Sequence, residues 1–350
     1  MIYYWCAGQD DNIGDVILRR RMLRSLQDAA PCCAVYVGGA SEDFVAALGL
    51  RPQDRVYTNF WRFVLMATVH SLRKEWLFGF NPGEIMCIRR QSIMHALLIP
   101  MMLISLVHGK RCLRIGVGVG LHDYRAIWRH LIWVTVRLAK VNIWRDAPSR
   151  DVFGIGTVAP DWAFDESDED SVPAEDLPGR KYLGVALRSD GAATSPEWTA
   201  AIGSMAQELG ITPVVVVQVR RDAARARALA AEMGCDLLDW TDESHAEQEK
   251  RLRYVYRRCE AVVSDRLHVL VMALTEGAIP LGLMEHSDDK VARHFAAAGF
   301  DAVSWDVRGL DESEIITRGI VGVRDRPEIE LCTRRARSCV RALDSVVRTS

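Results

Sequence analysis

The chain has 350 residues and a mass of 39.2 kDa, with 49% hydrophobic and 26% charged residues. This composition excludes a disordered chain, a collagen and a polytopic membrane protein, and the length favours two domains over a single core. The formal charge of -2 gives no bias toward nucleic acid, and we expect no nucleic-acid partner. The charge is uneven, however: residues 1–150 hold 20 Lys/Arg and 11 Asp/Glu, whereas residues 151–350 hold 24 and 35. This asymmetry predicts two domains that face different partners.

The nine cysteines show no C-x-x-C pair and no His/Cys spacing of the zinc type, so we predict no metal site. The N-terminus, MIYYWCAGQDD, lacks the basic region and apolar core of a signal peptide. We therefore expect a cytoplasmic protein with reduced thiols.

Short apolar runs alternate with helical patterns, which indicates stacked βαβ units and parallel sheets. In the N-terminal half the predicted strands are 2–7, 34–38, 112–119 and 141–144, and the predicted helices are 15–27, a segment from 41, and 124–139. Residues 60–106 are expected to be helical but show no clear divisions. Within them, 93–107 are nearly all apolar. Because a spanning helix needs about 20 apolar residues, we favour a buried helix kinked at Pro100 over a segment lying against a membrane.

The alternation stops between 161 and 180, where DESDED at 165–170 and two prolines indicate a solvated linker. It resumes with predicted strands at 182–187, 213–219, 261–263 and 280–283, and helices at 196–209, from 222, from 245, at 266–276 and at 328–347. The predicted domains are therefore 1–164, which is basic, an acidic linker 165–180, and 181–350, which carries the closing C-terminal helix. The expected fold class is α/β, with two Rossmann-like domains that each contain a parallel sheet.

The strongest candidate site is SDRLH at 264–268, where a predicted strand meets a predicted helix. Ser264 and Asp265 stand where an N-cap is needed, and Arg266 and His268 fall in the first turn. The unpaired N–H groups and the dipole of a helix N-terminus favour an anion, and a guanidinium binds phosphate bidentately. The alternative is that Arg266 pairs with an acidic neighbour and His268 is structural.

A second candidate is DDNIGD at 10–15, where Gly14 permits a tight turn and Asn12 and Asp15 can bond hydroxyls or cap a helix. Turn chemistry alone explains the same residues. The glycine-rich segment 116–120 lacks the spacing of a dinucleotide fingerprint, so we interpret it as a turn that lets backbone approach a ligand, and we do not expect NAD.

SDRLH, followed by an apolar helix, AIPLGL and Lys290, resembles the polysaccharide pyruvyl transferases. The resemblance continues in register with NIGD, with IWRDAPSR around Arg145, with Asp161-Trp-Ala-Phe164 and with the strand that ends in Arg188. These anchors span residues 12 to 290. The chain departs from the family at Gly120-Leu-His122, where Gly-Pro is usual, and at Trp162, where proline is usual.

The resemblance implies a fold like that of the B-type glycosyltransferases, in which the two parallel sheets face a cleft, with 1–164 on the acceptor side and 181–350 binding an anionic donor. It also implies transfer of the enolpyruvyl group of phosphoenolpyruvate to two hydroxyls of one sugar, with release of phosphate. It needs no cofactor. Arg266, Arg188, Arg145, Ser264 and Lys290 would bind the donor, while Asn12, Gly14, Asp15 and His122 would bind the saccharide acceptor. His268 would protonate the methylene carbon, with His122 in reserve, and Asp15 or Asp161 would receive the hydroxyl proton.

Two other functions fit the same residues. A sugar-nucleotide glycosyltransferase of this fold would hold its diphosphate at the Arg–His helix end, and a non-catalytic saccharide-binding protein would release no phosphate. The acceptor is expected to be a polysaccharide or a lipid-linked oligosaccharide. On the predicted helix 124–139, Arg129, Trp133, Arg137 and Lys140 gather on one side, and the side opposite them is apolar. This arrangement predicts peripheral, salt-sensitive contact of the N-terminal domain with an anionic membrane.

Overall fold

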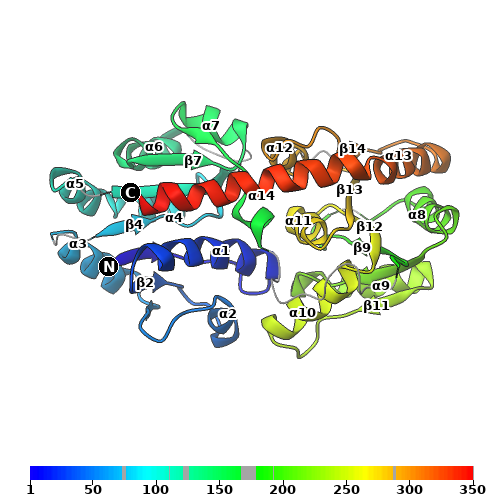
Figure 1. The fold of residues 1–350 in the computed structure, drawn as a ribbon, viewed down its shortest axis with the longest axis horizontal. Coiled ribbons are helices and arrows are strands. Elements are labelled where there is room, and N and C mark those ends of the chain that lie inside the picture. Colours follow the sequence, from blue (N-terminus) through cyan, green and yellow to red (C-terminus); the bar gives the residue numbers. More distant parts are fainter. Residues whose placement is uncertain are drawn as a thin grey trace. The chain divides into compact units, whose positions relative to one another are not determined.

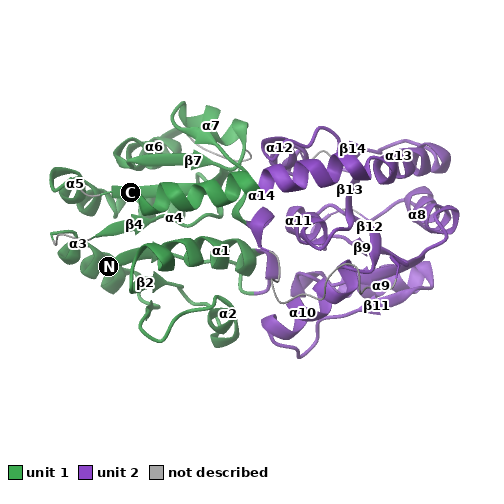
Figure 2. Cartoon of the chain, in the orientation of Figure 1, with its two compact units in different colours: residues 1–10, 15–162, 338–350 green, residues 11–14, 163–337 purple. Residues whose placement is uncertain are grey.

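The computed structural model describes residues 1–72, 76–109, 111–120, 126–166, 179–191, 193–286 and 289–349. These residues form two compact units, shown in Figure 2: unit 1 is Met1–Asp10, Asp15–Trp162 and Ser338–Ser350, and unit 2 is Asp11–Gly14 and Ala163–Arg337. Each unit contains one parallel sheet with helices around it (Figure 1). All strand pairs in the described residues are parallel, as the βαβ alternation predicts.

The sheet of unit 1 has the strand order β3-β2-β1-β4-β6-β7-β8, and β5 pairs with β6. Its strands are β1 (Ile2–Trp5), β2 (Cys33–Tyr36), β3 (Arg55–Tyr57), β4 (Leu77–Gly79), β5 (Glu84–Ile85), β6 (Arg111–Val119), β7 (Val141–Trp144) and β8 (Thr157–Val158). Its helices are α1 (Ile13–Ala29), α2 (Glu42–Ala47), α3 (Phe60–Ser71), α4 (Arg89–Ala96), α5 (Ile99–Val107), α6 (Ala126–Leu138) and α7 (Ala147–Phe153).

Alternation along β1 separates the two faces of this sheet. Tyr3 and Trp5 point into a buried aromatic cluster that α3 and α5 close with Phe63 and Met101. Tyr4 points the other way, and its hydroxyl donates to the carbonyl of Arg19 on α1 at 3.3 Å. Unit 1 is therefore a three-layer sandwich, with α1 on one face and α3 and α5 on the other.

The sheet of unit 2 has the order β11-β10-β9-β12-β13-β14. Its strands are β9 (Tyr182–Ala186), β10 (Thr212–Val216), β11 (Asp236–Leu238), β12 (Cys259–Ser264), β13 (Ile279–Met284) and β14 (Ser304–Asp306). Its helices are α8 (Pro196–Glu208), the 3-10 turn η3 (Arg220–Asp222), α9 (Ala223–Met233), α10 (His245–Tyr256), α11 (Leu267–Thr275), α12 (Lys290–Ala297) and α13 (Glu312–Arg324); the 3-10 turn η1 (Trp162–Asp165) precedes the sheet, and α14 (Arg326–Arg348) follows it.

The predicted domain boundaries differ from these units in three places. Residues Asp11–Gly14 belong to unit 2 although their neighbours belong to unit 1. The sequence predicts that the closing helix α14 belongs to the C-terminal domain, but residues 338–350 belong to unit 1. There Arg21 of α1 forms a bidentate pair with Asp344 at 2.8 and 3.0 Å. The predicted solvated linker begins with Asp165, which is the last residue of η1, and the next residue, Glu166, is only 1% exposed; residues 167–178 lie outside the described part of the chain.

The apolar run at 93–107 is not one kinked helix. Helix α4 ends at Ala96 and α5 begins at Ile99, with Pro100 in its first turn. Proline has no N–H to give to the carbonyl four residues earlier, and its ring clashes with that carbonyl, so the hydrogen-bond ladder breaks here. By length and composition alone, residues Arg89–Val107 could cross a membrane. A third of this segment is buried inside the protein. Leu98 and Met102 anchor it in the core of unit 1.

The glycine-rich segment 116–120 is not a ligand-binding turn, because Gly116 and Gly118 lie inside β6. Gly116 has a φ of +75° at an irregularity in the register with β7. A Cβ there would stand 2.5 Å from the ring of Trp162, and one on Gly118 would stand 2.4 Å from Nε of Arg145. The glycines therefore make room for two large side chains of the same unit. The indole N–H of Trp162 donates to the carbonyl of Ile115 at 3.2 Å.

Candidate functional site

The order in which strands are added to the sheet of unit 2 reverses between β9 and β12, although all of its strands are parallel. Strands β10 and β11 are added on one side of β9, and β12, β13 and β14 are added on its other side. In open parallel sheets, ligands bind at such a switch point, beyond the carboxyl ends of the strands. Arg188 follows β9 and Arg266 follows β12, so two predicted donor-binding residues lie at the switch point of unit 2.

Ser264 joins the two strands at this point. Its hydroxyl donates to the carbonyl of Ala186, at the end of β9, at 2.5 Å, and accepts the N–H of Arg266 at 3.0 Å. Ser264 is completely buried. Arg266, rather than the predicted Ser264 or Asp265, occupies the N-cap of α11, and its own side chain makes no cap hydrogen bond. Ser264 therefore fixes the geometry of this helix end, and the guanidinium of Arg266 can interact with groups outside the helix.

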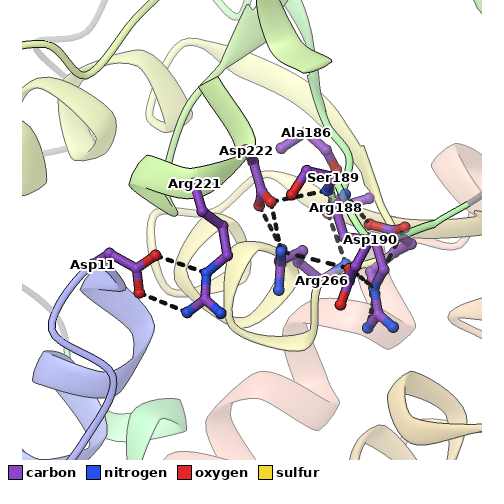
Figure 3. A network of polar contacts seen from close by, with 10 residues as sticks. Asp11, Ala186, Arg188, Ser189, Asp190, Arg221, Asp222 and Arg266 are labelled. Carbon is purple, nitrogen blue, oxygen red and sulfur yellow. Dashed lines mark hydrogen bonds and ion pairs between the residues drawn. The ribbon is translucent and has the colours of Figure 1, made fainter. Parts of the chain in front are cut away.

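The guanidinium of Arg266 lies in a bidentate pair with Asp222, with its Nε and Nη2 each 2.6 Å from a carboxylate oxygen (Figure 3). Asp222, at the end of η3, also accepts the backbone N–H of Ser189 at 2.9 Å and is 5% exposed. The alternative raised by the sequence, a pair with an acidic neighbour, is thus what the structure contains. A carboxylate occupies the fork of Arg266 in the geometry that a phosphate would take.

Arg188 belongs to the same network. Its backbone N–H donates to Asp265 at 2.9 Å, and its Nε lies 3.6 Å from the other oxygen of that carboxylate and 3.8 Å from Asp190 (Figure 3). Burial raises the pKa of Asp265 above its usual value, and the Arg188 guanidinium acts in the opposite direction. The pair of arginines is therefore framed by three carboxylates. Sequence reasoning missed Asp222 and Asp190, because their role depends on loops far apart in the chain.

The NIGD turn lies against this helix end. Asn12 accepts the N–H of Gly14 at 2.9 Å, and the backbone of Ile13 donates to Gln218 at 3.3 Å. A Cβ on Gly14 would stand 2.4 Å from the Cβ of His268, in the first turn of α11. Glycine is therefore required at position 14, because any side chain there would collide with His268. The structure brings together two motifs that the sequence could only place separately.

Asp11 holds the turn in place. Its carboxylate receives Nε and Nη2 of Arg221 at 2.7 and 2.6 Å, and its carbonyl accepts the N–H of Arg220 at 2.8 Å (Figure 3). The predicted acceptor residues Asn12 and Gly14 thus lie in unit 2 with His268, and not in the N-terminal domain. Lys290, the first residue of α12, is in the same unit, and α12 packs against α11.

The other predicted site residues lie in unit 1. Asp15 accepts the N–H of Gln9 at 2.6 Å and pairs with Arg19 at 3.2 Å. Arg145 and Asp161 form an ion pair at 3.1 Å with side-chain exposures of 2% and 0%. Arg145 and Asp161 therefore belong to unit 1, whereas Arg188 and Arg266 belong to unit 2, and the roles predicted for Arg145 and Asp161 stay predictions. His122 lies outside the described residues.

Unit 1 has its own switch point, between β1 and β4. The carbonyl of Ala7 accepts hydrogen bonds from Asn81 at 2.8 Å and from Nε of Arg19 at 3.1 Å. A Cβ on Gly83 would stand 2.8 Å from Arg19. Sequence reasoning missed both Asn81 and Arg19; the signal for the first was the Asn-Pro-Gly turn at 81–83. In the described residues, no cluster of three or more His, Cys, Asp or Glu side chains could hold a metal.

Two parallel sheets of this topology define the fold of the B-type glycosyltransferases, as the family resemblance implied. Solved structures with this fold match nearly the whole chain. A putative UDP-N-acetylglucosamine 2-epimerase from Listeria monocytogenes is 10% identical with a TM-score of 0.57, covering 97% of this chain and 90% of that one. The glycotransferase of kitacinnamycin is 12% identical with a TM-score of 0.59, covering 99% and 96%.

The UDP-GlcNAc 2-epimerase of Neisseria meningitidis, solved bound to UDP-GlcNAc, is 10% identical with a TM-score of 0.56 and full coverage of both chains. No family model matches the sequence, and a search of curated proteins finds no match. At these identities the likeness establishes the fold.

Proposed function

We propose that the protein is a sugar-modifying enzyme whose phosphate-bearing donor binds unit 2 at the switch point between β9 and β12. The observation that carries this proposal is the placement of Arg188 and Arg266 at that switch point, beside the N-terminus of α11. Two guanidinium groups and a helix N-terminus at the carboxyl edge of a parallel sheet suit a phosphate. An arriving donor would replace Asp222 in the fork of Arg266.

The first candidate donor is a sugar nucleotide. The structural neighbours support it, since they include epimerases named for UDP-N-acetylglucosamine and a glycosyltransferase. The diphosphate would lie at the N-terminus of α11 between Arg188 and Arg266, and the reacting sugar would extend toward His268 and the Asn12–Gly14 turn. In this position His268 could exchange a proton with the sugar or with an acceptor hydroxyl.

The second candidate donor is phosphoenolpyruvate, favoured by the order of motifs from Asn12 to Lys290 and by the contact between Gly14 and His268. A sugar hydroxyl would attack C2 of the enol while His268 delivers a proton to C3, and the proton that this hydroxyl loses would restore the one given up by His268. A second hydroxyl would then displace phosphate, which takes up the second hydroxyl proton as it leaves, and the cyclic pyruvate ketal closes. Both donors place negative charge at the same arginines, so the site alone does not choose between them.

Thermal unfolding of the purified protein with UDP-GlcNAc, UDP or phosphoenolpyruvate distinguishes the candidates, because only a ligand of the folded state raises the Tm. A shift with UDP and UDP-GlcNAc alone supports the sugar-nucleotide enzyme, and a shift with phosphoenolpyruvate alone supports pyruvyl transfer. The shift should disappear in Arg266→Ala. It should persist in the control Arg227→Ala, which removes an exposed cation of α9 that pairs with Asp239, the residue after β11. If none of the three ligands raised the Tm, the proposal would be overturned.

A further inference from the structure

The exposed large hydrophobic side chains of the described residues are gathered in one part of unit 1. Eleven of the fourteen lie between residues 61 and 133, on or beside α3, α4, α5 and α6. A soluble surface shows such side chains singly, and a concentration of them marks an interaction site. This set of helices covers the sheet face opposite α1.

Helix α3 has apolar residues on its outward face as well as on its core face. Trp61, Leu65, Val69 and Leu72 follow one another at helical spacing and are 65%, 62%, 48% and 60% exposed. The opposite face packs in the core through Phe63. A helix that is apolar all round is normally covered on both sides. The outward stripe of α3 therefore calls for a covering surface outside the unit.

Helices α5 and α6 continue this face. Helix α5 packs against both α3 and α6, and the three helices are labelled near one another within unit 1 in Figure 1. Leu106 and Val107 at the end of α5 are 55% and 83% exposed. On α6, Trp133 is 37% exposed, and the guanidinium of Arg137 stands 5.7 Å from its ring centroid. We call the outward side chains of α3, α5 and α6 the apolar face.

Positive charge surrounds the apolar face. The sequence from 57 to 140 holds 12 Lys/Arg, of which Arg114 is buried, and only 3 Asp/Glu. The exposed cations include Arg62 on α3, Arg89 and Arg90 on the neighbouring α4, and Arg137 on α6. A second copy of the chain would bring like charges together across this face, whereas an anionic surface would neutralise them. Aliphatic side chains, tryptophan and cations in one face match the interface of an anionic bilayer.

We propose that the apolar face is a docking surface for an anionic lipid bilayer. The contact is peripheral, because α4 and α5 have 8 and 9 residues, against the roughly 20 of a spanning helix. The sequence placed this contact on the basic side of α6; the structure adds the stripe of α3, which helical periodicity had not separated from the core. The buried face of α6 is formed by Ile132, Thr135 and Val136.

Co-sedimentation with phosphatidylcholine vesicles, with and without phosphatidylglycerol, tests this surface. We expect about tenfold tighter binding to the anionic vesicles, and weaker binding at high salt. The double variant Trp61→Ser/Leu65→Ser should weaken binding about tenfold. The matched control Tyr254→Ser/Val321→Ser changes side chains that are 57% and 49% exposed in unit 2, and it should bind as the unaltered protein does.

Equal binding to neutral and anionic vesicles, binding to neither, or unchanged binding of the Trp61/Leu65 variant would overturn the proposal. So would a concentration-dependent dimer in sedimentation equilibrium that the same variant abolishes, because a second copy would then cover the face. Both variants change exposed side chains, so their thermal unfolding should match that of the unaltered protein and exclude misfolding as the cause.

Discussion

Replacing Asp161 by asparagine should destabilise unit 1 because it leaves the guanidinium of Arg145 charged and enclosed. The two groups are 3.1 Å apart, and their side chains are 2% and 0% exposed. Burial lowers the pKa of Arg145, while Asp161, Glu84 and Asp146 raise it by more, so its net pKa lies above the ordinary value. Removing one partner of a buried pair costs about 3–5 kcal/mol. Because Glu84 and Asp146 remain, we expect about 3 kcal/mol.

Urea unfolding at pH 7 measures this loss. With a slope of about 3 kcal/mol per molar urea, the midpoint of unit 1 should fall by about 1 M. The control Asp151→Asn removes an ion pair whose side chains are 42% and 63% exposed, and it should cost less than about 1 kcal/mol. The double variant Arg145→Met/Asp161→Leu should recover most of the loss, because it removes both charges of the pair, while the buried Asp146 keeps its hydrogen bonds from Ser149. If Asp161→Asn behaved like Asp151→Asn, the assignment of Asp161 as the necessary counter-ion would be refuted.

Four further substitutions test other parts of the structure. Gly14→Ala should cost about 1–3 kcal/mol by overpacking against His268, whereas Gly203→Ala in α8, where a Cβ meets nothing within 4 Å, should be neutral or stabilising in the same thermal melt. Burial alone would raise the pKa of Asp344, but its partner Arg21 lowers it by more, so the net pKa is below the unfolded value. Asp344→Asn should therefore cost about 1 kcal/mol of stability at pH 7 and nothing near pH 2, as measured by urea titrations. His268→Ala should lower kcat and leave the donor Kd unchanged, while Arg266→Lys should raise that Kd about tenfold, both measured by calorimetry and steady-state kinetics.

Most of the central strands were predictable because they are apolar and buried on both faces. The prediction of a strand at 112–119 corresponds to β6, Arg111–Val119, and that at 280–283 to β13, Ile279–Met284. The edge strands β3 and β11 were missed, since each has three residues and is largely exposed, so neither shows an apolar run. Residues 60–106 could not be divided because the outward stripe of α3 hides its periodicity.

The candidate site was predictable only in pieces. The helix end at Arg266 followed from a strand-to-helix transition, and the turn at Gly14 from local turn chemistry. Their contact depends on a turn near the N-terminus joining unit 2, and periodicity carries no information about such long-range docking. The pairing of Arg266 with Asp222, 44 residues away, is likewise a tertiary property.

The division of α14 between the two units affects how unit 1 folds during synthesis of the chain. Residues 338–350 supply the part of unit 1 that meets Arg21, yet 188 residues must be synthesised after Trp162 before this segment is complete. At a synthesis rate of about 5–20 residues per second, residues 1–162 wait about 10–40 s for this helix. During that interval the surface of α1 stays uncovered and is a natural substrate for a chaperone. A fragment cut after Trp162 would remain in that state permanently, so the N-terminal unit should be expressed with residues 326–350 supplied alongside it.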